Sequence, residues 1–235
     1  MPLPPHNGRR RAVIEDVYPQ VDSGRHPICR DVGDEGVVTA AIFADGKDEG
    51  AARLLFRHSD DHRWSFASMH ATGNDLWSGS FRVDKLGYWR YSLLAWIDHF
   101  ATWTSQLKKR IAAQKDPVSA EIPSNSVAGL IVGSKFVEQD VALALRFGAE
   151  LIQAAAQRTH GNDAKSLREI AERFEKLAAE NRENYDDPCD EELLRLMRNY
   201  PDLANGDQYT RCELNYVALR PGIQPAHNFR VSRIQ

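Results

Sequence analysis

Apolar and polar residues alternate with a period of two through the first hundred residues, which predicts β-strands. Turn-forming Gly, Asp and Asn separate the segments that carry this pattern. The expected strands cover residues 13–18, 37–43, 51–57, 63–69, 76–83 and 88–97. Short strands with turns between them favour an immunoglobulin-like antiparallel β-sandwich.

After Trp103 the period of the apolar residues changes to 3.6, which predicts helices. The last of these helices is expected to begin at Asp187-Pro188, a capping residue followed by proline at the first helical position. It should stop before Pro201. Two further helices are expected at 106–114 and 136–156, and another, capped by Asn162 or Asp163, carries its apolar residues over 167–178. Together these helices predict a small up-down bundle.

These patterns predict an α+β chain with segregated domains. Weak strand signals at 214–219 and 229–234 leave open whether the end of the sequence closes the sandwich. The expected organisation is a flexible lead-in over 1–10, the β-sandwich over 11–103, the helical bundle over 104–203 and a C-terminal segment over 204–235.

Composition narrows the class of protein. The 235 residues are 42% hydrophobic and 27% charged, with a net charge of -3, which is typical of a globular protein with a packed core. Interspersed charges argue against nucleic-acid and anionic-membrane partners. No apolar run approaches the roughly 20 residues that span a bilayer. Three widely spaced cysteines without a CxxC pair indicate a reducing compartment, so we expect a cytoplasmic protein.

Two histidine-containing motifs are candidate sites of chemistry. His58 and His62 are four residues apart, which suits a metal site on a helix, but they fall on a predicted hairpin connector. A solvated turn is therefore the favoured interpretation. Asp98-His99 suggests a carboxylate-oriented base, but a strand-to-helix corner in which Asp98 accepts backbone N–H bonds is favoured. We predict no metal, no cofactor and no catalytic residue.

The tryptophans offer a candidate ligand site. All five lie between Trp64 and Trp103, and their flat faces suit stacking against sugar rings. Tryptophan in a short-stranded sandwich more often belongs to the core. If any of them contacts sugar, Trp64 and Trp77 are preferred because they lie near turns.

The stretch from Gly73 to Trp103 resembles the N-terminal module of the bacterial alpha-1,4-glucan:maltose-1-phosphate maltosyltransferases. The resemblance extends over roughly 11–213 and is strongest before residue 116. The residues that carry it are Gly73, Asn74, Asp75, Trp77, Gly79, Phe81, Val83, Gly87, Tyr91, Ala95, Trp96, Asp98, Phe100, Ala101, Thr102 and Trp103.

The resemblance implies a β-sandwich with an inserted helical bundle that together support dimerisation. In the family, a following α-amylase-type (β/α)₈ barrel transfers maltosyl from maltose 1-phosphate to a glucan end with retention of configuration. Leu94 stands where the family commonly has an acid, and the similarity ends after Glu213-Leu214. No catalytic residue can be carried over. We expect a chain truncated before the barrel, from a split or frameshifted gene, or a stand-alone relative.

The first hypothesis is a non-catalytic accessory and dimerisation region acting in cytoplasmic α-glucan synthesis. The helix at 136–156 is more apolar than a three-helix monomer easily covers, so a homodimer is expected. A separately made catalytic barrel is the other expected partner. The alternative is a free-standing module that binds maltooligosaccharide, and independent activity on maltose 1-phosphate is not expected. The interface residues proposed for the dimer are Phe136, Val141, Leu145 and Leu151.

Overall fold

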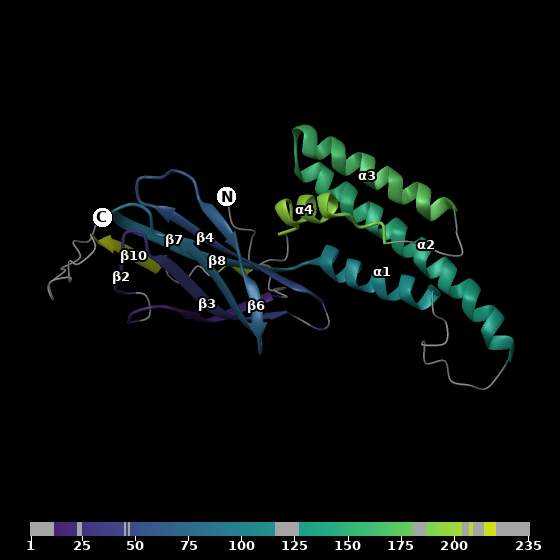
Figure 1. The fold of residues 1–235 in the computed structure, drawn as a ribbon, viewed down its shortest axis with the longest axis horizontal. Coiled ribbons are helices and arrows are strands. Elements are labelled where there is room, and N and C mark those ends of the chain that lie inside the picture. Colours follow the sequence, from purple (N-terminus) through teal and green to yellow (C-terminus); the bar gives the residue numbers. More distant parts are fainter. Residues whose placement is uncertain are drawn as a thin grey trace. The chain divides into compact units, whose positions relative to one another are not determined.

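The structure is a computed structural model that describes residues 12–22, 25–44, 46, 48–115, 127–180, 187–203, 207–208 and 214–219. The chain forms two compact units, which divide between Ile97 and Asp98 and again between Asp202 and Leu203. Strands build the first unit and helices the second (Figure 1). The predicted α+β class, with helices and mainly antiparallel sheets in separate parts of the chain, is confirmed.

The strand unit holds two sheets. In the first, every pair of neighbouring strands is antiparallel, and the order β1-β3-β7-β6 joins Ala12–Tyr18, Glu35–Ala44, Leu76–Arg82 and His70–Gly73. The second has the order β2-β10-β8-β4-β5, with a short β9 beside β8. Its strands are β2 (Ile28–Asp31), β4 (Gly50–His58), β5 (Ser65–Ser68), β8 (Gly87–Ile97), β9 (Asp207–Gln208) and β10 (Leu214–Leu219). The strand expected at 214–219 is thus β10, which pairs with β8 and, in parallel, with β2.

Residues from both sheets share one hydrophobic core. Phe81 of β7 stacks on Phe56 of β4, with ring centroids 4.8 Å apart and planes 15° from parallel. Trp89 and Tyr91 of β8 lie at the edge of the same cluster, 5.9 and 6.4 Å from the Phe81 ring. The buried Tyr91 hydroxyl donates a hydrogen bond to the carbonyl of Pro19. These contacts join strands that are distant in sequence.

Two features of the sheets differ from the prediction. The weak alternation in β1 predicts Val13, Glu15 and Val17 on one side, and this is wrong for Val17. The register shifts between Glu15 and Tyr18, so Val17 is buried whereas Val13 and Glu15 are exposed. This bulge puts an extra residue on one strand and reverses the inside–outside phase. Strands β2 and β6 were not predicted, since their four-residue segments show no apolar alternation. The turn expected after Gly73 is present, with positive φ at Asn74 and Asp75 as a type I′ hairpin requires.

The helical unit comprises α1 (His99–Lys115), α2 (Val127–Arg158), α3 (Gly161–Glu180) and α4 (Glu191–Asn199). Helix α1 begins before the predicted residue 106, because Asp98 accepts the Ala101 N–H at 2.9 Å and Trp103 lies on the buried face. Helix α4 is capped by Asp190 and not by Asp187, whose carboxylate instead accepts the N–H of Cys189 at 3.0 Å. As far as the described residues go, none of these helices is long and apolar enough to cross a membrane.

The core of the helical unit is built around Trp103. Its indole N–H donates a hydrogen bond of 2.7 Å to the carbonyl of Ala144, one turn before Gly148 in α2. The indole ring occupies the space where a side chain at Gly148 would stand. Phe100 and Phe174 flank the same ring, with centroids 5.2 and 5.8 Å away. An aromatic side chain of α1 is therefore seated against the backbone of α2.

The Asp190→Ala variant is expected to lower the free energy of unfolding by about 1 kcal/mol at pH 7, because alanine cannot cap α4. Asp190 accepts the Leu193 N–H at 2.8 Å and pairs with Arg173 at 3.0 Å. Burial acts to raise the pKa of Asp190, but these two partners outweigh it and hold the pKa below its ordinary value. The cap contribution is therefore complete above the unfolded pKa of about 3.9 and disappears as the pH falls through the folded value.

Urea denaturation of the parent and the Asp190→Ala variant at pH 7 and at pH 3 tests this prediction. The difference between the two proteins should shrink at pH 3, and an equal difference at both pH values would contradict it. Glu172→Ala, at an exposed position on α3, serves as the control and should stay within about 0.5 kcal/mol of the parent.

Candidate functional site

The two tryptophans predicted to stack on sugar lie in different environments. Trp77 is on β7 of the first sheet and packs, half-buried, against the core of the strand unit. Trp64 directly precedes β5 of the second sheet and is 37% exposed. The structure therefore does not bring the two rings together, and Trp64 is the one that is open to a ligand.

Trp64 belongs to an exposed surface on the outer side of β4 and β5. Successive residues of a strand point to opposite faces, so Arg53, Leu55 and Arg57 of β4 share one face. Phe66 of β5 is paired with Leu55 across the ladder, lies on that same face and is 52% exposed. We refer to Trp64, Phe66, Arg53 and Arg57 as the β4–β5 surface.

Each exposed ring of the β4–β5 surface has a guanidinium over it. The Arg57 guanidinium carbon lies 4.9 Å from the centre of the Trp64 ring, and that of Arg53 lies 4.3 Å from the Phe66 ring. Burial lowers the pKa of Arg53, although arginine stays charged in proteins. Among the described residues, the buried Nε of Arg57 finds no hydrogen-bond acceptor. Cation–π contacts thus hold these rings in place.

Phe66, Arg53 and Arg57 were missed as candidate residues. The sequence carried a usable signal, because the alternation in 51–57 sets both arginines on one face and the predicted hairpin sets 63–69 beside it. What the sequence did not reveal was which of the two faces is buried.

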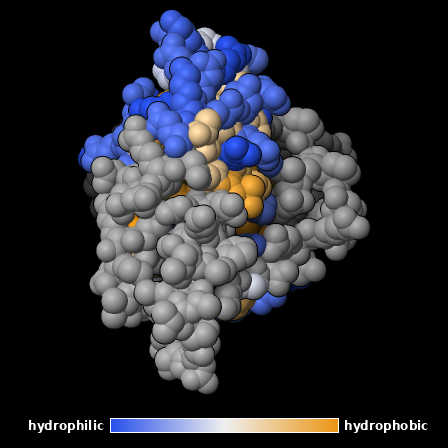
Figure 2. Space-filling model, turned by 90° about the vertical axis from the view of Figure 1, so that its right-hand side faces the viewer, coloured by the Kyte–Doolittle hydropathy of each residue, from blue (hydrophilic) through white to orange (hydrophobic). Residues whose placement is uncertain are grey.

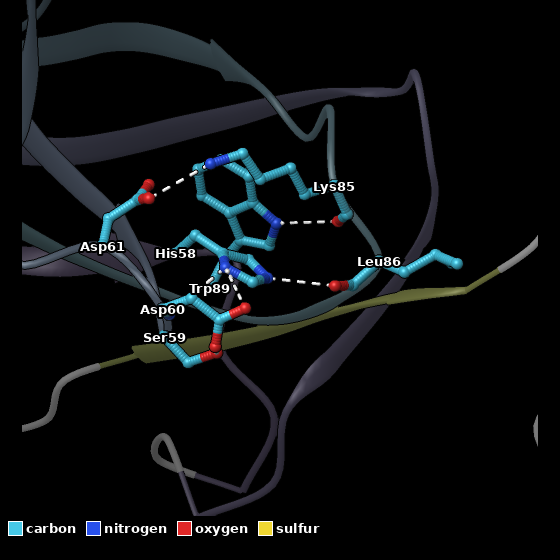
Figure 3. Close-up of polar contacts among 7 residues, drawn as sticks. All are labelled: His58, Ser59, Asp60, Asp61, Lys85, Leu86 and Trp89. Atoms are coloured by element: carbon cyan, nitrogen blue, oxygen red, sulfur yellow. Dashed lines mark hydrogen bonds and ion pairs between the residues drawn. The ribbon is translucent and has the colours of Figure 1, made fainter.

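A buried histidine fixes the connector that leads to Trp64. His58, the last residue of β4, points its Nε2 at the carbonyl oxygen of Leu86, 3.0 Å away (Figure 3). Its Nδ1 accepts the N–H of Asp60 at 3.3 Å. A carbonyl oxygen only accepts hydrogen bonds, so Nε2 is the donor to Leu86. The Asp60 carboxylate lies 3.6 Å from Nδ1. An ion pair of 3.1 Å between Lys85 and Asp61 joins the same two connectors.

The solvated-turn interpretation therefore holds for His62, which is exposed, and is wrong for His58, which is buried. His58 packs edge-on against Trp89, with ring centroids 5.2 Å apart, because the aromatic cluster extends to the end of β4. Trp89 in turn donates its indole N–H to the Lys85 carbonyl at 3.1 Å. Within the described residues, no three His, Cys, Asp or Glu side chains gather as metal ligands would.

The His58→Phe variant is expected to lower the free energy of unfolding by about 1.5 kcal/mol, since two backbone groups lose their partners. Chemical denaturation measures the effect. His62→Phe changes an exposed residue of the same connector and is the matched control, with an expected effect within about 0.5 kcal/mol. Equal effects of the two substitutions would contradict the structural role of His58.

The corner at Asp98-His99 is structural, as favoured from the sequence. The Asp98 carboxylate accepts the Ala101 N–H at 2.9 Å. The backbone carbonyl of Asp98 accepts the Thr102 hydroxyl at 3.0 Å. Both contacts stabilise the first turn of α1. The side chain is engaged in capping.

The residues predicted for a dimer interface lie in α2 and differ in how deeply they are buried. Val141 and Leu145 are buried in the core of the helical unit, and Leu151 packs partly buried against it. Phe136 lies in α2, but its side chain is outside the described residues. Helices α1 and α3 pack against this face of α2, and apolar residues of all three helices form one core.

The opposite face of α2 exposes two large apolar side chains. Leu143 is 65% and Phe147 51% exposed, and the four-residue spacing places them on one side of the helix. The charged residues Arg146 and Glu150 lie on the same side and are also exposed. Figure 2, which views the molecule from the right-hand side of Figure 1, shows hydrophilic residues above a small apolar area.

Comparison with known proteins places the chain in a family context. Residues 10–216 match the family model for alpha-1,4-glucan:maltose-1-phosphate maltosyltransferase, domain N/S. A protein of that enzyme name from Chlorobaculum tepidum is 37% identical over 163 residues, which cover 69% of this chain and 21% of that protein. Another from Salinibacter ruber is 32% identical over 170 residues, covering 72% and 22%.

A third relative, from Methylacidiphilum infernorum, is 41% identical over 112 residues and has the same enzyme name. The match covers 48% of this chain and 17% of that protein. The chain therefore spans about a fifth of the length of the curated relatives that it matches.

Proposed function

We propose, from the premise that the chain belongs to the alpha-1,4-glucan:maltose-1-phosphate maltosyltransferase family as its domain N/S, that it is a non-catalytic accessory and dimerisation region. The observation that carries this proposal is the family match over residues 10–216, which covers the helical unit and most of the strand unit. The relatives' names place them in α-glucan metabolism, and we propose that this chain acts in α-glucan synthesis in the cytoplasm. The transfer of maltosyl would be performed by a catalytic barrel, in the same polypeptide or as a partner.

The proposed architecture is an immunoglobulin-like β-sandwich that carries an up-down helical bundle. Two sheets whose inner residues share one core support the sandwich. The position of the helical unit between β8 and β9 in the sequence supports the insertion of the bundle into the sandwich, because the chain returns to the sheet after α4.

The dimer is proposed to form across the exposed face of α2. Leu143, Arg146, Phe147 and Glu150 follow the i, i+3, i+4, i+7 spacing of a single helical face. In a two-fold interface the same patch meets itself, so a patch with both charge signs can pair with its own copy. Two exposed apolar side chains flanked by Arg146 and Glu150 have this composition. We therefore expect two α2 helices to pack together.

Sedimentation of the full chain at micromolar concentration tests the dimer. The parent is expected to sediment as a dimer and the Phe147→Glu variant as a monomer, because a buried unpaired carboxylate is strongly unfavourable. The matched control, Ala179→Glu, adds the same charge at an exposed position on α3 and should remain dimeric. Circular dichroism checks that the variant keeps its helices, and a parent that sediments as a monomer would contradict the proposal.

A further inference from the structure

We propose that the β4–β5 surface binds an α-1,4-glucan chain, with the Trp64 and Phe66 rings stacked against sugar rings and the Arg53 and Arg57 guanidinium groups facing their hydroxyls. The kind of sugar rests on the proposed function, whereas the presence of a saccharide site rests on the geometry of this surface. This role is independent of the α2 face proposed for the dimer.

The Trp64 and Phe66 rings are both accessible and lie close together in the sequence. Trp64 and Phe66 are 37% and 52% exposed, although aromatic side chains of this size are ordinarily drawn into a core. They are two residues apart in the sequence, with Trp64 directly before β5 and Phe66 within it. Arginines of the same β4 face contact both rings. A linear oligosaccharide lying along β5 can therefore meet one ring after the other.

The polar groups of the surface suit a polyol. A pyranose ring presents C–H groups on its flat faces and hydroxyls around its rim. A guanidinium stacked on an aromatic ring keeps its five N–H donors in the plane of the group, at the edge of that ring. The Arg57 guanidinium lies over Trp64, so the N–H donors at its outer edge can reach the hydroxyls of a sugar that meets this ring. Ser68, two residues after Phe66 on the same face of β5, adds an exposed hydroxyl.

The connector to Trp64 is held in place before any ligand binds. His58 bonds to both the Leu86 carbonyl and the Asp60 N–H, and Lys85 pairs with Asp61 (Figure 3). A ligand that must order a loop binds more weakly, because the loop loses conformational entropy on binding. A connector that is already fixed avoids this loss, which matters most for ligands of low affinity such as sugars. His58 is thus a positioning residue for Trp64.

Affinity electrophoresis of the full chain in native gels with and without soluble amylose tests the proposal. Retardation by amylose is expected for the parent, and isothermal titration with maltoheptaose should give a saturable heat. Trp64→Ala and Phe66→Ala are each expected to weaken binding about tenfold, the size of a lost stacking contact. Arg57→Lys should also weaken it, because the ammonium lacks the planar donors. Phe43→Ala, an exposed ring on the first sheet, is the matched control and should bind as the parent does.

Three results would overturn the proposal. One is a parent that amylose does not retard, and another is equal loss in the Phe43→Ala control. The third is equal affinity for cellohexaose, whose β-linkage tests the kind of sugar. Sedimentation separates this inference from the proposed function: a dimer that does not bind amylose removes the sugar site alone. If Trp64→Ala instead abolishes the dimer while amylose has no effect, the surface is a protein interface and the inference is wrong.

Discussion

The Gly148→Ala variant is expected to lower the free energy of unfolding of the helical unit by about 3 kcal/mol. A Cβ at Gly148 would lie 2.1 Å from Cζ2 of Trp103 and 2.7 Å from Cε2, so the indole ring must move. Overpacking of this kind costs up to about 3 kcal/mol, and displacing the indole N–H from the Ala144 carbonyl costs about 1 more. Alanine returns about 1 kcal/mol because it is the better helix former. The steric terms therefore exceed the helix propensity.

Thermal or urea unfolding followed by the far-ultraviolet signal of the helices measures this effect. The second variant, Trp103→Phe, removes the ring atoms that a Cβ at Gly148 would strike. In a double-mutant cycle, Gly148→Ala should cost at least about 1 kcal/mol less in the Trp103→Phe background than in the parent. An alanine variant that is as stable as the parent, or equal costs in both backgrounds, would show that the indole does not occupy this space.

This contact also shows why helix patterns were predicted better than helix partners. The apolar period located α2 and α3, since a helical stripe is a local property. The start of α1 was placed too late because Asp98 caps it and Trp103 lies inside it, within a segment rich in strand-type aromatics. That Gly148 receives Trp103 depends on a contact between residues 45 positions apart, which no local pattern encodes.

The candidate surface could be predicted only in part for a similar reason. Trp64 and Trp77 both lie near turns, and turn proximity alone does not say which side chain points outward. The ladder pairs Phe66 with Leu55 on the outer face, while Trp77 joins Phe81 on the inner one. The sequence predicts a solvated His58 because its polar neighbours adjoin it in the chain, whereas the Leu86 carbonyl that holds it comes from another connector. Pairing between distant strands decides these assignments.

The Phe81→Ala variant is expected to lower the free energy of unfolding of the strand unit by about 4 kcal/mol, as is usual for truncating a buried phenylalanine. Phe81 is buried, stacks on Phe56 at 4.8 Å and lies within 6.4 Å of the Trp89 and Tyr91 rings. Its removal leaves a cavity between the two sheets, and rings held by backbone pairing cannot collapse into it.

The matched control is Phe43→Ala on β3, where the ring is 42% exposed and the same substitution should cost within about 0.5 kcal/mol. Near-ultraviolet circular dichroism reports the aromatic cluster, while the far-ultraviolet signal of the helices reports the other unit. If the two compact units unfold separately, the Phe81→Ala variant shifts the first transition and leaves the second in place. A loss no greater than that of Phe43→Ala would mean that the two sheets do not share a core at Phe81, and the proposed sandwich would fail with it.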